Sequence, residues 1–328
     1  NDELLKPYFK LENVLDGLFT LTNKLYGLTF KENKTIPVWN PEVKAYEIFD
    51  EKGKLLAVWY GDYFPRAGKR AGAWNTGTLS QHFEGTKDVR PHVINVCNFT
   101  RPTDTKPSLL TFREVETLFH EFGHALHSMM SHVKYETVSG TSVSWDFVEL
   151  PSQFMENFCT EPEVLKLFAK HYQTGEVIPN ELIEKIKQSS NFMSGIGLTR
   201  QINLGLTDMA WHNGAPTGES VADVEKKVAE QTDLYPIVPG TAVSTAFSHI
   251  FAGGYSAGYY SYMWSSVLDA DAFEAFKEKG IFNKEVSASF RDNILSKGGT
   301  EKPMELYKRF RGREPKPDAM LKRDGLAL

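Results

Sequence analysis

Cysteine is scarce in this sequence, and a long hydrophobic run is absent. Its 328 residues include only two cysteines, too few for a disulfide framework, and we expect Cys97 and Cys159 to be buried free thiols. No apolar run approaches the roughly 20 residues that span a bilayer, so we expect no membrane partner. Basic runs are also missing, and with a net charge of −5 we expect no nucleic-acid partner.

Targeting signals are missing as well. The chain begins at Asn1 and shows no signal peptide before its first helical pattern. Free thiols are typical of a reducing compartment, so we expect a cytoplasmic protein. Because the sequence can be a fragment, the missing signal peptide adds little to this expectation.

What is present is a mainly helical pattern with one β-rich stretch. Apolar residues at helical spacing predict a helix over 4–26 that ends at Gly27. Within about 36–100, "KAYEIFDEKGKLLAVWYGDYF" predicts a hairpin, "RAGKRAGAWNTG" a glycine-rich loop and "HVINVCNF" a further strand. After residue 110 the chain is almost wholly helical in pattern. We therefore expect a mainly α fold in which residues 1–328 form a single region with one small sheet.

The segment "TFREVETLFHEFGHALHSMM" (111–130) predicts an amphipathic helix that carries three histidines. Thr111 and Glu114 form a capping-box pattern at its start. Apolar residues at helical spacing predict one buried stripe, made of Val115, Leu118, Phe122, Leu126 and Met129. The histidines lie at i, i+4 and i+7 on a second stripe.

The pentapeptide "HEFGH" within this helix matches the H-E-x-x-H pattern of zinc peptidases. His120 and His124 point the same way one turn apart, so two imidazoles can reach one ion. Glu121 is rotated about 100° from His120. It therefore borders the ion, where it can take a proton from metal-activated water. The alternative is a buried helix whose histidines bond to their neighbours.

Two residues compete to be the third metal ligand. His127 lies about 10.5 Å from His120 along the helix axis, so we expect it to form hydrogen bonds or face substrate. Glu149, 29 residues after His120, is the better candidate. A loop containing Gly140 can turn the chain back before it, and "VSWDFVELPSQFMENF" then predicts a second helix.

This second helix would carry Glu149, Gln153 and Glu156 on one face. Glu156 would then lie behind the site and accept the other N–H of a ligating histidine. Asp146 is the rival for this role, and its competing interpretation is a helix N-cap. Pro151 must lie in the first turn or at a kink.

Together, "LFHEFGHALH" and "WDFVELPSQFMEN" resemble the zinc-dependent thimet oligopeptidase family, in particular its oligopeptidase A and peptidyl-dipeptidase subgroup. The resemblance extends to "CNFTRP", "GGYSAGYYSYMW" and "PMELYKRFRGREP". It implies a zincin-type helical catalytic domain, one Zn²⁺ held by His120, His124 and Glu149, and Glu121 as general base. It also implies that the chain is the C-terminal catalytic part of a longer protein. The N-terminal lobe would then be a partner, as a separate segment or chain.

A glycine pair and four tyrosines occur in "FAGGYSAGYYSYMW" (251–264). Peptide hydrolysis needs a donor aimed at the developing oxyanion, which a tyrosine O–H can provide. The resemblance assigns Tyr255 and Tyr262 to stabilising the intermediate and binding substrate, and the glycine loop to closing over the peptide. The substrate-binding candidates are His127, His249, Gly253, Gly254 and Tyr259.

The sequence therefore predicts a zinc metallopeptidase that hydrolyses short unstructured peptides. An alternative is a peptidyl-dipeptidase that releases C-terminal dipeptides. An alternative from another class is a non-catalytic zinc-binding fragment or regulatory module. "HVINVCNF" and "GTSVSW" are the predicted walls of a substrate channel, because an extended peptide can add to an exposed sheet edge.

Overall fold

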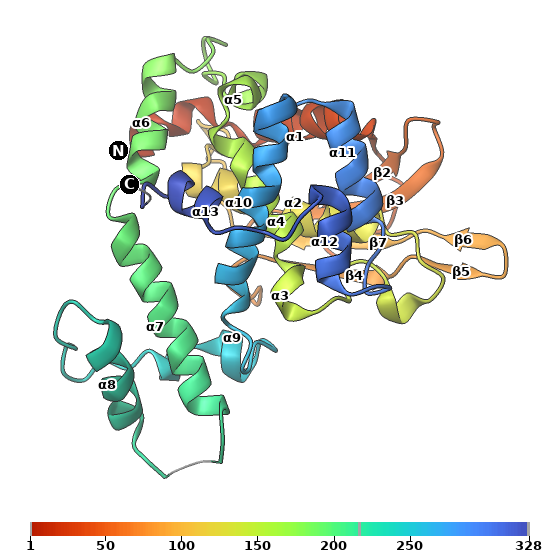
Figure 1. Ribbon diagram of the computed structural model, residues 1–328. Coiled ribbons are helices and arrows are strands. Elements are labelled where there is room, and N and C mark those ends of the chain that lie inside the picture. The colour runs from red at the N-terminus through yellow and green to blue at the C-terminus, as the bar shows by residue number, and fades with distance from the viewer. Residues whose placement is uncertain (1, 216–217, 327–328) are drawn as a thin grey trace.

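The computed structural model describes residues 2–215 and 218–326 and is mainly helical, with a small sheet to one side (Figure 1). The helices are α1 (Leu11–Tyr26), α2 (Phe112–Met129), α3 (Trp145–Val148), α4 (Leu150–Glu156), α5 (Pro162–Phe168), α6 (Asn180–Ser190), α7 (Ser194–His212), α8 (Val221–Thr232), α9 (Ser248–Phe251), α10 (Ser261–Lys279), α11 (Lys284–Phe290), α12 (Pro303–Arg311) and α13 (Asp318–Arg323). The predicted fold class is confirmed. Among the described residues, no helix is both long and apolar enough to cross a membrane.

The sheet lies between α1 and α2 in the chain. Its strands are β1 (Thr29–Glu32), β2 (Lys44–Phe49), β3 (Leu55–Asp62), β4 (Trp74–Leu79) and β7 (His92–Val96), and β5 (His82–Glu84) and β6 (Lys87–Val89) form a separate hairpin. The five strands have the order β1-β2-β3-β7-β4. β3 and β7 are parallel, whereas the other neighbours are antiparallel. β4 is therefore an edge strand, and β7 lies inside the sheet.

Two strand predictions are confirmed and one loop prediction is wrong in part. The β2–β3 hairpin turns at Gly53, where φ is 75°, and β7 is the strand expected from "HVINVCNF". The end of the predicted glycine-rich loop instead forms β4, which begins at Trp74. Trp74 and Thr76 favour a strand, but Asn75 and Gly77 are unfavourable in one, so pairing with β7 helps to hold the strand conformation. β1 and the short β5–β6 hairpin were not predicted.

The N-terminal helix is shorter than predicted. α1 begins at Leu11, and two short 3₁₀ turns, Asp2–Leu4 and Lys6–Tyr8, precede it. Pro7 lacks the N–H that a continuous helix over 4–26 would use. The predicted end is confirmed, because Gly27 adopts a φ of 71° and donates its N–H to the Asn23 carbonyl.

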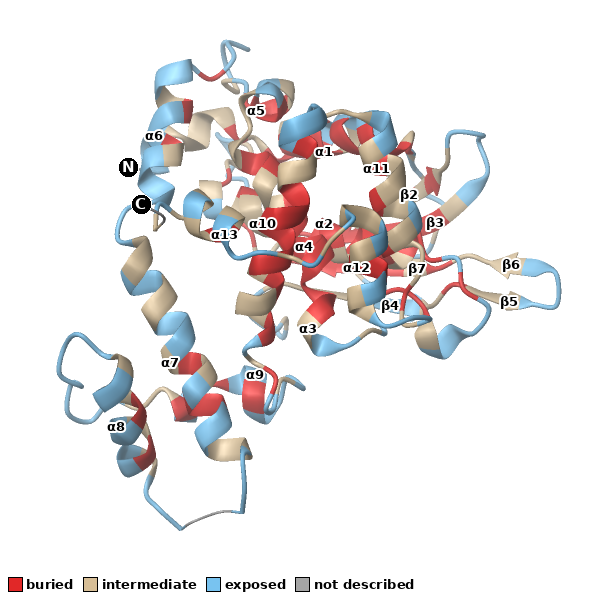
Figure 2. Ribbon diagram, in the orientation of Figure 1, coloured by how far each residue is buried: buried red, intermediate tan, exposed pale blue. Residues whose placement is uncertain are grey.

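Aromatic packing fixes the sheet against α2. Trp59 of β3 is fully buried, and its ring lies edge-on to Phe122 of α2 with 5.1 Å between ring centroids. The indole N–H donates to Asn95 Oδ1 on β7 at 2.8 Å. Figure 2 shows that buried residues concentrate along α2, α4 and α10, whereas much of α7 and α8 is exposed. Both cysteines are buried and free, as predicted.

The second predicted helix of the site is broken into α3 and α4, which meet at Glu149. Pro151 lies in the first turn of α4, as its missing N–H requires. The N-cap interpretation of Asp146 is wrong, because Ser144 occupies the N-cap position of α3 and Asp146 follows in its first turn. Glu149 therefore lies at the junction of the two helices, as the C-cap of α3 and the N-cap of α4.

Candidate metal centre

Helix α2 begins at the predicted capping box. Thr111 Oγ1 accepts the Glu114 N–H at 3.1 Å, and Glu114 Oε2 accepts the Thr111 N–H at 2.8 Å. The predicted apolar stripe is fully buried from Val115 to Met129. This anchors α2 against the core and leaves His120 and His124 partly accessible on another side.

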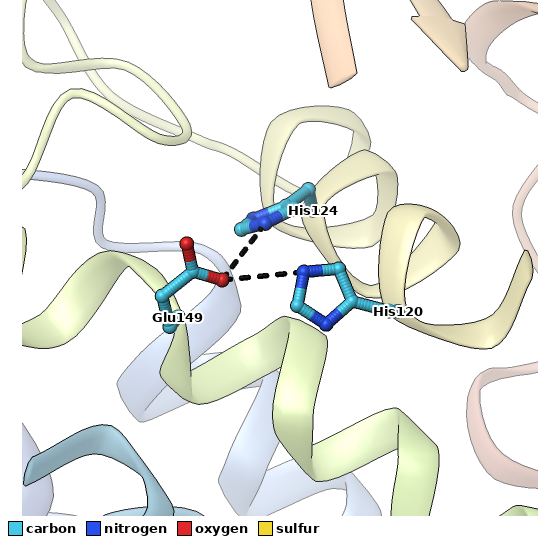
Figure 3. Close-up of side chains that lie close together, drawn as sticks. All are labelled: His120, His124 and Glu149. Atoms are coloured by element: carbon cyan, nitrogen blue, oxygen red, sulfur yellow. Dashed lines mark ion pairs between the residues drawn. The ribbon is translucent and has the colours of Figure 1, made fainter. Parts of the chain in front are cut away.

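The two histidines converge on one carboxylate oxygen. Glu149 Oε2 lies 3.1 Å from His124 Nε2 and 3.3 Å from His120 Nε2 (Figure 3). The three possible ligand atoms all lie within 4.8 Å of one another. The structure therefore brings together the residues that the sequence placed 29 positions apart.

Gly123 permits this convergence. A Cβ atom at Gly123 would lie 2.3 Å from the Pro151 carbonyl oxygen and 2.6 Å from Ser152 Cα. Real Cβ atoms essentially never come this close to backbone, so any side chain here would push α4 away from α2. The glycine between the two histidines thus sets the close approach that brings Glu149 to them.

Hydrogen bonds hold both oxygens of the Glu149 carboxylate. Ser152 Oγ donates to Oε2 at 2.7 Å, and the Tyr255 hydroxyl donates to Oε1 at 2.6 Å. Burial alone would raise the pKa of Glu149, but the His124 and His120 imidazoles outweigh it and hold that pKa well below its usual range. Glu149 is therefore a fixed anion, as a metal ligand must be.

Glu156, rather than Asp146, lies behind the site. His120 Nδ1 is 2.5 Å from Glu156 Oε1, so this ring nitrogen carries the proton and Nε2 is free to bind a metal. The Asp146 carboxylate lies instead 3.4 Å from the Tyr260 hydroxyl. Glu156 sits at the end of α4, so one helix supplies both the carboxylate at its start and the one behind the histidine.

Glu121 has a buried oxygen without a protein partner. Its side chain is 5% exposed, and Oε2 forms no hydrogen bond with the described residues. Burial raises the pKa of Glu121, although the neighbouring His120 and His124 rings oppose this. A buried carboxyl oxygen left without a partner beside two histidines is suited to receive a proton from a bound molecule.

The expectation for His127 is wrong. Its side chain is fully buried, and neither ring nitrogen has a hydrogen-bond partner in the described part of the chain. Burial lowers its pKa to about 3, so the ring is neutral at physiological pH. His127 therefore neither faces substrate nor joins the other two histidines, because one further turn of α2 carries it into the core.

The tyrosine segment reaches the site through turns rather than through one helix. α10 begins only at Ser261, although the chain after residue 110 is almost wholly helical in pattern. The Tyr255 and Tyr262 rings nevertheless stack with 5.1 Å between centroids. His249 lies beside both, at 6.0 and 6.1 Å. Gln153 of α4 donates to the Tyr262 carbonyl at 3.2 Å, which ties this segment to the helix behind Glu149.

Gly254 of the glycine pair packs closely against Trp145. Gly254 has a φ of 87°, and a Cβ there would lie 3.1 Å from the Trp145 ring. Gly253 donates its N–H to the Ser248 carbonyl at 2.7 Å. Tyr259 packs against Phe247 with 4.8 Å between ring centroids. The segment therefore follows a tight path in which Gly254 could not carry a side chain without strain.

Two imidazoles and one carboxylate make a donor set that fits zinc. Catalytic zinc sites use three protein ligands, and two histidines with one glutamate are one such set, which leaves one position open. Oxygen-only sets suit calcium and magnesium better. The site is thus chemically suited to Zn²⁺, and the partnerless Glu121 oxygen lies next to the first ligand in the chain.

Sequence comparison places this arrangement in a known family. Residues 1–326 match the family described as Peptidase family M3. The chain belongs to peptidase family M3. Over 99% of its length it is 47% identical to oligopeptidase A of Escherichia coli and 42% identical to dipeptidyl carboxypeptidase of the same organism.

This M3 chain covers 48% of the length of each of those two relatives, so it spans about half of them. The solved structure of Pyrococcus furiosus carboxypeptidase is similar in fold, with a TM-score of 0.57 at 14% sequence identity. The match covers 97% of this chain and 58% of that one. It supports the zincin-type helical fold that was expected from the sequence.

Three residues that lie around the candidate metal centre or support the tyrosine segment were not predicted from the sequence. Gly123 was readable as a glycine inside a helical pattern, which often marks a close backbone approach. Ser152 gave no signal, because its bond to Glu149 depends on the break between α3 and α4. Asp208, on α7, accepts backbone N–H groups of the tyrosine segment, and a contact at such a sequence distance leaves no local pattern.

Glu156→Gln is expected to weaken zinc binding about 10- to 100-fold, as loss of a carboxylate behind a ligating histidine does. The glutamine oxygen can still accept from His120 Nδ1, but the negative charge that raises the basicity of the ring is lost. Competition with a chromogenic zinc chelator measures the change. Glu163→Gln, at an exposed position on α5, is the matched control. Equal zinc affinity in the parent and Glu156→Gln would contradict the assignment.

Proposed function

We propose that this chain is the metal-bearing catalytic part of a zinc peptidase that hydrolyses short unstructured peptides. The observation that carries the proposal is the convergence of His120, His124 and Glu149, with the partnerless oxygen of Glu121 beside them. Membership of family M3 supports it. Oligopeptidase A and dipeptidyl carboxypeptidase, by their names, act on peptides.

His120 and His124 would bind the ion through Nε2, and Glu149 through its carboxylate. When bound, zinc supplies Lewis-acid chemistry, because it polarises a carbonyl oxygen and lowers the pKa of water. The protein supplies the geometry. Glu156 fixes the tautomer of His120, and Ser152 fixes the orientation of Glu149.

Glu121 is the proposed general base and acid. Its free oxygen takes a proton from the attacking water and then delivers that proton to the leaving amine. The burial that raises the pKa of this carboxyl makes it a stronger proton acceptor than an exposed glutamate. Buried surroundings also keep the proton from exchanging with bulk solvent between the two transfers.

Tyr255 is the proposed donor to the oxyanion, with Tyr262 stacked against it. Burial raises the pKa of both phenols well above neutral pH, so each hydroxyl keeps its proton. The Tyr255 hydroxyl already lies 2.6 Å from a Glu149 oxygen. A small rotation redirects this donor to a substrate oxygen beside the ligands, where it stabilises charge that develops in the transition state.

The free edge of β4 is the proposed binding site for the substrate backbone. The predicted walls of the substrate channel were "HVINVCNF" and "GTSVSW", but the first of these is β7, which pairs on both sides with β3 and β4. In the described part of the chain no strand pairs with the outer edge of β4. Main-chain pairing there would hold an extended peptide with little regard to its side chains.

Zinc removal is the direct test. The chain is expected to cleave a quenched peptide of about ten residues, to lose this activity after dialysis against a chelator, and to regain it with one equivalent of zinc. The metal content is measured in parallel. Bound zinc without turnover would favour the non-catalytic zinc-binding module. In that case, the proposed partner is a separate segment that corresponds to the part of the relatives that this chain does not cover. This segment would be added to the assay in trans.

The same assay separates the two peptidase types. Oligopeptidase A is the more similar of the two relatives, at 47% identity, but dipeptidyl carboxypeptidase, at 42%, supports the alternative of a peptidyl-dipeptidase. Such an enzyme must grip a free terminal carboxylate, whereas an oligopeptidase cuts internal bonds. We expect equal cleavage of peptides with free and amidated C-termini. A marked loss on amidation would favour the dipeptidase.

A further inference from the structure

Asp208 of α7 binds the backbone of the tyrosine segment from a distance of about fifty residues in the chain. Its side chain is 1% exposed. Oδ1 accepts the Ala257 N–H at 2.9 Å, and Oδ2 accepts the Tyr259 N–H at 2.9 Å. Each carboxylate oxygen thus accepts one backbone N–H. The two N–H groups lie two residues apart in the turn that precedes α10.

The turn needs this support. Ala257 has a φ of 54°, a left-handed conformation that is unfavourable for a residue with a Cβ atom. With Ala257 in this conformation, the two amides point to the same side and form a concave anion-binding surface. The buried carboxylate fills that surface, so Asp208 stabilises the strained turn in addition to the turn's own hydrogen bond from the Gly258 N–H to the Tyr255 carbonyl.

His212 completes the set of donors to Asp208. Its Nδ1 lies 2.7 Å from Asp208 Oδ1 and 3.0 Å from the Asp208 carbonyl oxygen. Both are acceptors, so Nδ1 carries the proton. The carboxylate therefore receives three N–H donors and is held in one orientation on α7.

Apolar contacts join the same two elements. Leu204 of α7 is buried with Phe247 and Ile250, and Tyr255 and Tyr259 pack against this cluster. Figure 1 shows the far end of α7 beside α9, and the ring of Trp211 lies 6.2 Å from that of Phe251. The position of α7 is thus transmitted to the tyrosine segment through both polar and apolar contacts.

We propose that Asp208, oriented by His212, is a positioning residue that places Tyr255 and Tyr262 at the metal centre. Asp208 contacts neither the metal ligands nor the hydroxyl groups of these tyrosines. It fixes the turn at Ala257, and the turn fixes where the Tyr255 hydroxyl lies relative to Glu149. This inference rests on the proposed function, because it assigns Asp208 a role in that reaction.

The test uses Asp208→Ala and the isosteric Asp208→Asn. The asparagine keeps one acceptor oxygen but turns an N–H donor towards one of the two amides. Both variants are expected to keep the zinc content of the parent, because α2 and α4 are untouched. Both should lose about 10²-fold in kcat, the size expected when a catalytic group is displaced by about 1 Å. KM should change only a few-fold. Glu230→Gln, an exposed acid on α8, is the control.

A double-mutant cycle separates positioning from a general loss of structure. If Asp208 acts through Tyr255, then Asp208→Ala causes only a few-fold further loss in a Tyr255→Phe background. If the losses in kcat of the two single variants multiply in full in the double variant, the inference is overturned. A parental kcat in Asp208→Ala also overturns it. If the alanine variant fails to fold, Asp208→Asn takes its place in the cycle.

Hydrogen exchange makes the outcome independent of turnover. Amides of residues 253–260 are expected to exchange faster in Asp208→Asn than in the parent, while those of α2 stay unchanged. Unchanged exchange at 253–260 overturns the inference whether or not the parent cleaves peptides. Failure of the parent to cleave any peptide with zinc bound overturns the proposed function instead, so the two failures are distinguishable.

Discussion

Glu121→Gln is expected to bind zinc like the parent chain and to lose about 10²- to 10⁴-fold in turnover, the contribution of a positioned general base. Glutamine has nearly the shape of glutamate, so the packing of α2 is kept. Its amide nitrogen carries protons and its oxygen is a very weak base, so it cannot take a proton from water. The measurement is kcat on a quenched peptide, together with zinc content per chain.

The control for this experiment is Glu184→Gln, which removes an exposed acid on α6 and should leave both quantities unchanged. Retained turnover in Glu121→Gln would exclude Glu121 as the base. Loss of zinc would show instead that the carboxylate stabilises the metal, which is not expected from its position beside rather than among the converging atoms. The zinc content of Glu121→Gln therefore distinguishes a role of Glu121 as the base from a role in stabilising the metal.

Local spacing was sufficient to predict the part of the site that lies on one helix. The capping box fixes the start of α2, and the 3.6-residue period fixes the common direction of His120 and His124. The same period failed for His127, which shares their direction but lies further along the axis. Periodicity gives the angle of a side chain around a helix. It does not say which neighbours cover that helix at each level.

Long-range contacts account for what the sequence did not predict. The edge strand β4 pairs with β7, although Asn75 and Gly77 within it are unfavourable in a strand. The helical pattern expected after residue 110 does not extend through residues 257–260, where Asp208 instead binds the amides of Ala257 and Tyr259. Such contacts join residues that are distant in sequence, so no pattern within a short window records them.

Glu149 was predicted in part from local spacing and depends in part on long-range contacts. Its spacing from His120 and the turn at Gly140 indicated that it could return to the histidines. The geometry of that return depends on a break between two helices and on a glycine in α2, and neither follows from spacing. The ligand was therefore predictable as a residue, whereas the packing that brings it to the site required the structure.

Gly123→Ala is expected to abolish zinc binding at concentrations that saturate the parent. The added methyl group would meet the backbone of Pro151 and Ser152 at 2.3 to 2.8 Å. Backbone atoms of a packed helix cannot move aside as a flexible side chain can. α4 must therefore shift away from α2, and Glu149 moves away from the histidines with it. Overpacking of this kind typically costs about 1–3 kcal/mol in the free energy of unfolding.

Zinc affinity and the midpoint of thermal unfolding, both measured on the same preparations, test this prediction. Gly197→Ala is the matched control, because no atom of the described residues, apart from neighbours in its own helix α7, lies within 4 Å of the added Cβ. Alanine also favours helix over glycine by about 1 kcal/mol. The stability of this control should be equal or higher, with parental zinc affinity. Parental zinc affinity in Gly123→Ala would show that α4 can adapt. If Gly123→Ala loses zinc and Glu121→Gln retains it, then zinc binding depends on the spacing between α2 and α4 and not on the general base.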